Sequence, residues 1–283
     1  MKALAQADPL LEGMYWIPDA EMCSGVYALD GGRTLIDAGN LYGLLDELLD
    51  LGPPDRLERL LITHAHFDHI GGAAEIYQSC APDFHIHPLG REHLRSHGEP
   101  FPAFFEALEK DGKMKLVQDG ELLGENPSLR AIHTPGHTDA DLCFFDARSG
   151  ALFSGDAVLP DTHRVGAGLS APDASSAGDV RRHMASLRKL LPLPVRHLMP
   201  GHGEPVFHKG ADRIKIALLN LYRSVHEGAP EKAWIAMGKD LAAAGNLGEA
   251  RQCAAKASRG KAASSPELTL LLEEIEKKGR RIE

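Results

Sequence analysis

Three histidines and one aspartate lie within six consecutive positions of this 283-residue chain, and they are His64, His66, Asp68 and His69. They directly follow the apolar run Leu60 to Ile62, which predicts a buried strand. Alternation along a strand would place His64 and His66 on the same side. Asp68 and His69 would then lie in the following loop. Neutral imidazole and carboxylate are the ligands that suit Zn²⁺, Mn²⁺ and iron, so this spacing predicts a metal site.

Three more residues of ligand type follow later in the chain, each at the end of a short apolar run. They are His137 in Pro135-Gly136-His137, Asp156 in Ser154-Gly155-Asp156 and His202 in Pro200-Gly201-His202. Loops at the ends of strands are where a rigid sheet commonly carries functional side chains. Together with the first cluster these residues make seven ligands, which is enough for two metal ions.

With these seven positions the sequence resembles the metallo-β-lactamase superfamily, through its H-x-H-x-D-H motif and the later His, Asp and His. The resemblance covers roughly residues 13 to 208. It implies an α/β fold, a four-layer αβ/βα sandwich with the metals at one edge of the two sheets. By the same resemblance, one metal would be held by His64, His66 and His137. The second would be held by Asp68, His69 and His202, and Asp156 would bridge both.

The ligand set itself indicates the chemistry. Five neutral imidazoles and two carboxylates leave two divalent ions with net positive charge, and a metal ion lowers the pKa of water from 15.7 to about 7. We therefore expect a dinuclear metal-dependent hydrolase, in which a bridging hydroxide cleaves a small ester, thioester or lactone. Zinc is the first expectation for the two ions, with iron or manganese as alternatives. Asp68 could also act in catalysis, by orienting the hydroxide or by relaying a proton.

Two other activities remain open at this point. The same ligands can hold a single non-haem iron, as in superfamily relatives that oxidise sulfur compounds, and the superfamily also contains nucleases. The formal net charge of −9 argues against a nucleic-acid partner. Among hydrolases, glyoxalase II-like thioesterases and lactonases share the motif. Asp156, however, is followed by Ala157, Val158 and Leu159, and not by the cysteine- and arginine-containing loop typical of glyoxalase II.

Composition predicts a cytoplasmic protein without a membrane partner. The hydrophobic fraction of 43% and the charged fraction of 25% are ordinary, and no run approaches 18 apolar residues. The N-terminal stretch lacks a basic-then-apolar secretory pattern. Four scattered cysteines, without a C-x-x-C pair, favour a reducing compartment.

Substrate contacts are expected from the long segment between Pro160 and Gly178, which could act as a lid. Its His163 and Arg164 could reach an anionic group of a small-molecule substrate, although a solvated loop is the simpler interpretation. Outside the seven ligands, Asp37 could contact a ligand histidine or cap a turn. His85, His87, His93, His97 and His133 are interpreted as ordinary histidines.

The chain is expected to divide into a catalytic domain, residues 1–208, and an all-helical extension, residues 209–283. Within the extension, residues 231–264 resemble a single tetratricopeptide repeat, with two antiparallel helices joined at Gly245-Asn246. One repeat cannot bury its own apolar face, so these helices are expected to pack on the catalytic domain, on a second copy in a homodimer or on a protein partner. Of these interpretations, a packed hairpin without a recognition role is favoured.

Overall fold

The computed structural model describes residues 1–18, 23–39, 43–96, 101–124, 129–160, 171–259 and 265–280. Its contacts divide the chain into two compact units. The first, here called the sheet unit, comprises Met1–His183 and Pro194–Arg213. The second, the helical unit, comprises Met184–Leu193 and Ile214–Glu283. The domain boundary expected after residue 208 stays a prediction.

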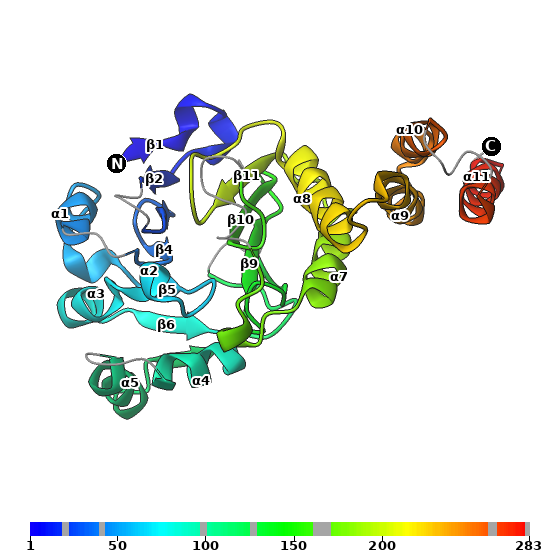
Figure 1. The fold of residues 1–283 in the computed structure, drawn as a ribbon. Coiled ribbons are helices and arrows are strands. Elements are labelled where there is room, and N and C mark those ends of the chain that lie inside the picture. The colour runs from blue at the N-terminus through cyan, green and yellow to red at the C-terminus, as the bar shows by residue number, and fades with distance from the viewer. Residues whose placement is uncertain are drawn as a thin grey trace. The chain divides into compact units, whose positions relative to one another are not determined.

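Two mixed β-sheets form the framework of the sheet unit (Figure 1). The seven-stranded sheet follows chain order, with β1 Lys2–Ala3, β2 Tyr15–Ile17, β3 Val26–Leu29, β4 Thr34–Ile36, β5 Arg59–Leu61, β6 Asp83–Ile86 and β7 Met114–Leu116. Its first four strands are antiparallel and β4 to β7 are parallel. The four-stranded sheet has the order β11-β10-β9-β8, with β8 Leu129–His133, β9 Leu142–Asp146, β10 Ala151–Gly155 and β11 His197–Pro200.

Helices make the crossovers that parallel strands need. They are α1 Leu44–Leu49 between β4 and β5, α2 Phe67–Ile70 and α3 Ala73–Cys80 between β5 and β6, and α4 Pro88–Ser96 and α5 Phe101–Lys110 between β6 and β7. The sheet unit also contains short 3-10 turns at Leu4–Gln6, Pro9–Leu11 and Pro54–Arg56.

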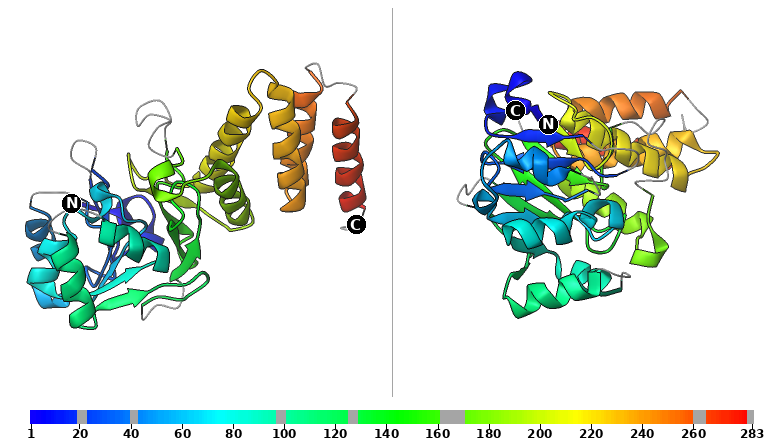
Figure 2. Two further views of the ribbon diagram at one scale, coloured as in Figure 1. Left: turned by 60° about the horizontal axis from the view of Figure 1, so that its bottom comes forward. Right: turned by 90° about the vertical axis from the view of Figure 1, so that its left-hand side faces the viewer.

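Alternation along the strands sends neighbouring residues into two different cores. Leu35 and Leu60 lie in the cluster that includes the helix residues Ile76 and Phe105. Ile36 and Leu61, one position along in each case, lie in the cluster shared with the other sheet. The two sheets therefore face each other, with α1 and α3 to α5 on the outer side of the larger sheet, as the further views in Figure 2 show. This arrangement of mixed sheets and helices is the expected metallo-β-lactamase fold.

The helical unit contains residues 184–190 of α7 Val180–Leu190 and most of α8 Gly210–Val225. It continues with α9 Pro230–Ala243, α10 Leu247–Ala257 and α11 Pro266–Gly279. At Gly238 of α9 a Cβ atom would lie 2.7 Å from Leu271 and 3.3 Å from Cys253, so glycine permits these helices to pack closely. The expected helical extension is therefore present, and the turn between α9 and α10 falls at Gly245, whose φ is +85°. No helix in the described part of the chain is long and apolar enough to cross a membrane.

Candidate metal centre

The loops that carry the ligand-type residues leave the carboxyl ends of β5, β8, β10 and β11. β5 ends at Leu61, and the chain passes through His64 to His66, whose backbone is extended, before α2 begins. Two expectations are therefore wrong. His64 and His66 are not on a strand, and Asp68 and His69 lie in the short helix α2 instead of a loop. The backbone N–H of His69 donates to the carbonyl oxygen of His66 at 2.9 Å, which closes this helical turn.

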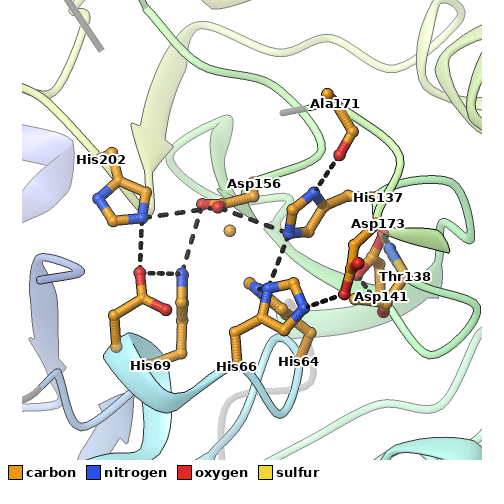
Figure 3. Close-up of polar contacts among 12 residues, drawn as sticks. His64, His66, His69, His137, Thr138, Asp141, Asp156, Ala171, Asp173 and His202 are labelled. Atoms are coloured by element: carbon orange, nitrogen blue, oxygen red, sulfur yellow. Dashed lines mark hydrogen bonds and ion pairs between the residues drawn. The ribbon is translucent and has the colours of Figure 1, made fainter. Parts of the chain in front are cut away.

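His64, His66 and His137 form the first group, here called the three-histidine group (Figure 3). Nε2 of His64 lies 3.1 Å from Nδ1 of His66, and Nε2 of His137 lies 3.0 Å from the same atom. Nitrogen ligands of a tetrahedral zinc ion, each 2.0–2.1 Å from the metal, are about 3.3–3.4 Å apart. The three rings are thus spaced nearly as they would be around one metal ion.

Outer hydrogen bonds fix where the protons of these rings lie. Nε2 of His66 lies 3.0 Å from Oδ2 of Asp173, and Nδ1 of His137 lies 2.8 Å from the carbonyl oxygen of Ala171. Carboxylate and carbonyl oxygens only accept, so each neutral ring carries its N–H on that outer side. The inner nitrogens of His66 and His137 then present lone pairs to each other, 3.0 Å apart. A cation between them removes the resulting repulsion.

Asp68, His69 and His202 form the second group, here called the aspartate group. Oδ2 of Asp68 lies 2.9 Å from Nε2 of His202 and 3.7 Å from Nε2 of His69. Nδ1 of His69 donates to Oδ2 of Asp37 at 2.8 Å, so Nε2 of this ring faces inward. Asp37 accepts from the backbone N–H of Thr63 as well, at 2.8 Å. Of the two roles considered for Asp37, contact with a ligand histidine is the one seen.

Asp156 lies between the two groups (Figure 3). Its Oδ1 is 3.4 Å from Nε2 of His69, and its Oδ2 is 3.5 Å from His202 and 3.7 Å from His137. Nε2 of His69 and Oδ1 of Asp156 are buried and lack hydrogen-bond partners. Buried polar atoms usually have partners, so these orphaned atoms fit metal ions. All seven ligand-type residues expected from the sequence are thus brought together; their roles as ligands stay a prediction.

Charges in the site suit cations. Burial lowers the pKa of His64 well below its ordinary value, and the neighbouring His69 and His137 lower it further. Burial opposes ionisation of Asp68, but the hydrogen bond from His202 and the charge of His69 outweigh it and lower the pKa to about 2. Burial likewise opposes ionisation of Asp156, and His69 again outweighs it, so that the pKa is lowered. Burial opposes protonation of His69, but Asp156 and Asp37 outweigh it and raise its pKa well above the ordinary value. The site therefore offers ionised carboxylates, and a metal ion bound by His69 would displace a proton from that imidazole.

A second cluster with metal-ligand atoms, Asp8, His197 and His208, has the opposite proton arrangement. Nδ1 of His197 accepts from the backbone N–H of His208 at 3.4 Å, so the proton of the neutral ring lies on Nε2, the atom that faces Asp8. The guanidinium of Arg196 already lies 2.8 Å from Oδ2 of Asp8. This cluster is therefore an ion-pair network around Asp8 and not a metal site.

The remaining expectations divide by position. His163, Arg164 and His97 lie outside the described residues, so the substrate role of the first two stays a prediction. His85, His87, His93 and His133 belong to none of the metal-type groups found among the described residues. His87 instead stacks on His133, with ring centroids 3.9 Å apart.

Sequence reasoning missed the outer partners Ala171 and Asp173. Asp173 contacts a residue 107 positions earlier in the chain, and Ala171 contributes only a backbone carbonyl. Neither feature leaves a recognisable pattern in the neighbouring sequence. The sequence Asp173-Ala174-Ser175 predicts a turn at most.

Comparison with known proteins agrees with the geometry. A family model described as the metallo-beta-lactamase superfamily matches residues 24–202, well over half of the chain. The chain is 29% identical over 192 residues to the beta-lactamase-like protein 2 homolog of Drosophila melanogaster, covering 65% of this chain and 59% of that protein. It is 30% identical over 186 residues to an atrochrysone carboxyl ACP thioesterase of Aspergillus fumigatus, and the match covers 64% of this chain and 50% of that protein. The chain thus spans about half to three-fifths of the length of these two relatives.

Solved structures share the fold. One is a protein crystallised in a di-iron-bound form, with a TM-score of 0.52 and 24% identity over 71% of this chain and 98% of that chain. Another is a metallo-beta-lactamase family protein from Thermus thermophilus, with a TM-score of 0.54 and 21% identity. The match covers 81% of this chain and 87% of that chain. The family match, the fold and the two groups of ligand-type residues agree, and the chain belongs to the metallo-beta-lactamase superfamily.

Proposed function

We propose that this protein is a dinuclear metal-dependent hydrolase that cleaves a small ester, thioester or lactone. The observation that carries the proposal is the pair of three-residue groups joined by Asp156, in which lone pairs and orphaned polar atoms face inward. His64, His66 and His137 would hold one ion, Asp68, His69 and His202 the other, and Asp156 would contact both. Ligands of this type suit zinc first, and iron or manganese next.

Two such ions would supply hydroxide at neutral pH and polarise the substrate carbonyl. The side chains have separate tasks around that chemistry. Asp156 is buried, with 3% of its side chain exposed, and serves to hold the two groups together. Asp68 is 30% exposed, so it is the carboxylate with access to solvent. It is placed to orient the attacking water or to accept its proton.

Thioesters are the first substrates to test. The relative from Aspergillus fumigatus is named an acyl-carrier-protein thioesterase, and one from Emericella nidulans, 28% identical over 152 residues, is also named a thioesterase. A thiolate is a better leaving group than an alkoxide, so hydrolysis depends less on protonation by the protein. An anionic small-molecule substrate, met by His163 and Arg164, is part of this proposal, as is a cytoplasmic location.

The test is a hydrolysis screen of zinc-, iron- and manganese-loaded protein with short acyl thioesters, aryl esters and lactones. His66→Ala and Asp156→Ala should lose at least about 100-fold in kcat/KM, because each removes a ligand. Asp179→Asn is the matched control, since Asp179 is exposed and its carboxylate accepts from the backbone N–H of Arg182 at 2.8 Å. Full activity in either ligand variant would overturn the proposal.

We also propose that the α9–α10 hairpin is tetratricopeptide-like and that the helical unit mediates self-association. Leu270 and Leu272 on α11 are 58% and 45% exposed, which supports an apolar contact with a second copy. Light scattering of the full chain tests this. A dimer that Leu270→Glu converts to a monomer supports the proposal, and a wild-type monomer at micromolar concentration contradicts it.

A further inference from the structure

The turn formed by residues 171–178, here called the bracing turn, is tied by backbone hydrogen bonds to the loop that carries His137. The N–H of Asp173 donates to the carbonyl oxygen of His137 at 2.7 Å, and the N–H of Asp139 donates to that of Ser176 at 3.0 Å. Gly178 allows the close approach, because a Cβ there would lie 2.3 Å from the carbonyl oxygen of His137. The bracing turn and the ligand loop are therefore packed backbone against backbone.

Two outer contacts to the three-histidine group come from this one turn (Figure 3). The carbonyl oxygen of Ala171 accepts from Nδ1 of His137 at 2.8 Å, and Oδ2 of Asp173 accepts from Nε2 of His66 at 3.0 Å. Residues of the bracing turn thus fix the proton position in two of the three rings.

The Asp173 carboxylate is itself held in place. It accepts from the backbone N–H of Ser175 at 3.0 Å and from the Ser175 hydroxyl at 2.7–2.8 Å. The Ser176 hydroxyl lies 3.3 Å from Nε2 of His66 as a further, longer contact. These contacts fix the carboxylate before any metal binds, which is how an outer partner orients a ligand.

His66 needs this restraint most. It faces inward with Nδ1, whereas His64 and His137 do so with Nε2. Its side chain is 25% exposed, compared with 6% for His137, so its ring has more freedom to turn. A ring flip or a change of tautomer would remove the lone pair from the site.

We infer that Asp173 is a positioning residue that sets metal affinity at the three-histidine group alone, by holding His66 with its proton on Nε2. The inference rests on the metal centre of the proposed function. The aspartate group depends on a different partner, since His69 is held by Asp37 after β4. The outer partners of the two groups therefore come from separate parts of the chain.

The test compares Asp173→Ala, Asp173→Asn and the control Asp179→Asn by competition with a chromophoric zinc chelator. Asp173→Ala should weaken one of the two equivalents of zinc by about 10- to 100-fold and leave the other within twofold. Asp173→Asn should have a smaller effect on the same equivalent, because neutral hydrogen bonds are roughly half as strong as charge-assisted ones. Asp179→Asn lies six positions along the chain and should match the wild type.

A second readout needs neither metal nor substrate. In metal-free protein with ¹⁵N-labelled histidine, long-range ¹H–¹⁵N spectra should show His66 as the Nε2–H tautomer in the wild type. In Asp173→Ala that tautomer should no longer dominate. Unchanged zinc affinities in Asp173→Ala, equal weakening of both equivalents, or an unchanged His66 tautomer would each overturn the inference. A wild type that binds two zinc ions but hydrolyses nothing would refute the proposed function and leave this inference standing.

Discussion

Asp37 offers the sharpest single perturbation of the aspartate group. Its carboxylate is 2% exposed and accepts from Nδ1 of His69 and from the backbone N–H of Thr63, both at 2.8 Å. The φ of Asp37 is +59°, a left-handed conformation that asparagine and aspartate tolerate better than most residues. Asp37→Asn therefore keeps the backbone and the size of the side chain, and changes only the hydrogen bonding.

The expected magnitude follows from those contacts. The amide oxygen of Asn can still accept from Thr63, and its NH₂ group then faces the N–H on Nδ1 of His69. Two donors cannot pair, so His69 moves its proton to Nε2, the atom that faces Asp68 and Asp156. A hydrogen bond to a charged group contributes about 1.5–3 kcal/mol, which corresponds to a loss of roughly 10- to 100-fold in metal affinity.

The assay is the zinc competition titration, with two dissociation constants resolved. Asp37→Asn should weaken the equivalent bound by the aspartate group and leave the three-histidine group unchanged. Asp83→Asn is the matched control, because Asp83 lies on β6, pairs with Lys113 at 3.2 Å and has a side chain that is 37% exposed. Wild-type affinity for both equivalents in Asp37→Asn would refute the reasoning, as would equal loss at both.

Three further predictions test the surroundings of the site. His85 is half-buried, both of its ring nitrogens are buried without a hydrogen bond, and burial lowers its pKa to about 4. Because the unfolded value is near 6.5, its contribution to stability is present above pH 6.5 and is lost as the pH falls towards 4. Denaturant titrations of wild type and His85→Phe should therefore diverge by about 2 kcal/mol between pH 7 and pH 5, and parallel curves would contradict this. Gly201→Ala should lose metal and activity together in elemental analysis and turnover assays, because its Cβ would lie 2.5 Å from Oδ1 of Asp156. Tyr222→Phe removes the hydroxyl that accepts from Arg188 at 3.1 Å, and should lower the free energy of unfolding by about 1 kcal/mol at unchanged kcat/KM; a change in turnover would count against a purely structural role.

Local spacing identified seven ligand-type residues that the structure brings together, and the resemblance that they carry implied the fold. Seven ligand-type residues at the ends of apolar runs form a pattern that one superfamily carries, and that pattern implies the sheets around it. The local backbone conformation around Asp68 and His69 was harder to predict from the sequence. Asp68 and His69 form a helical turn because the N–H of His69 and that of Ile70 both reach the carbonyl of His66, a detail that spacing alone does not specify.

The outer contacts of the site could not be predicted for a different reason. The bond between His66 and Asp173 depends on how two distant loops meet, and that depends on the packing of the whole sheet unit. Asp37 was easier to anticipate, because it directly follows β4, the immediate parallel neighbour of β5. Carboxyl ends of parallel strands lie at one edge, so a residue there falls near the ligands that follow β5.

Metal stoichiometry tests the central claim most directly. The measurement is elemental analysis of protein purified without added metal, combined with mass spectrometry under native conditions. The account predicts two equivalents of a divalent transition metal per chain, zinc first, with thioester or ester hydrolysis that is lost on chelation and restored by metal. One equivalent of iron per chain, with oxygen uptake in the presence of a sulfur substrate and no hydrolysis, would contradict it.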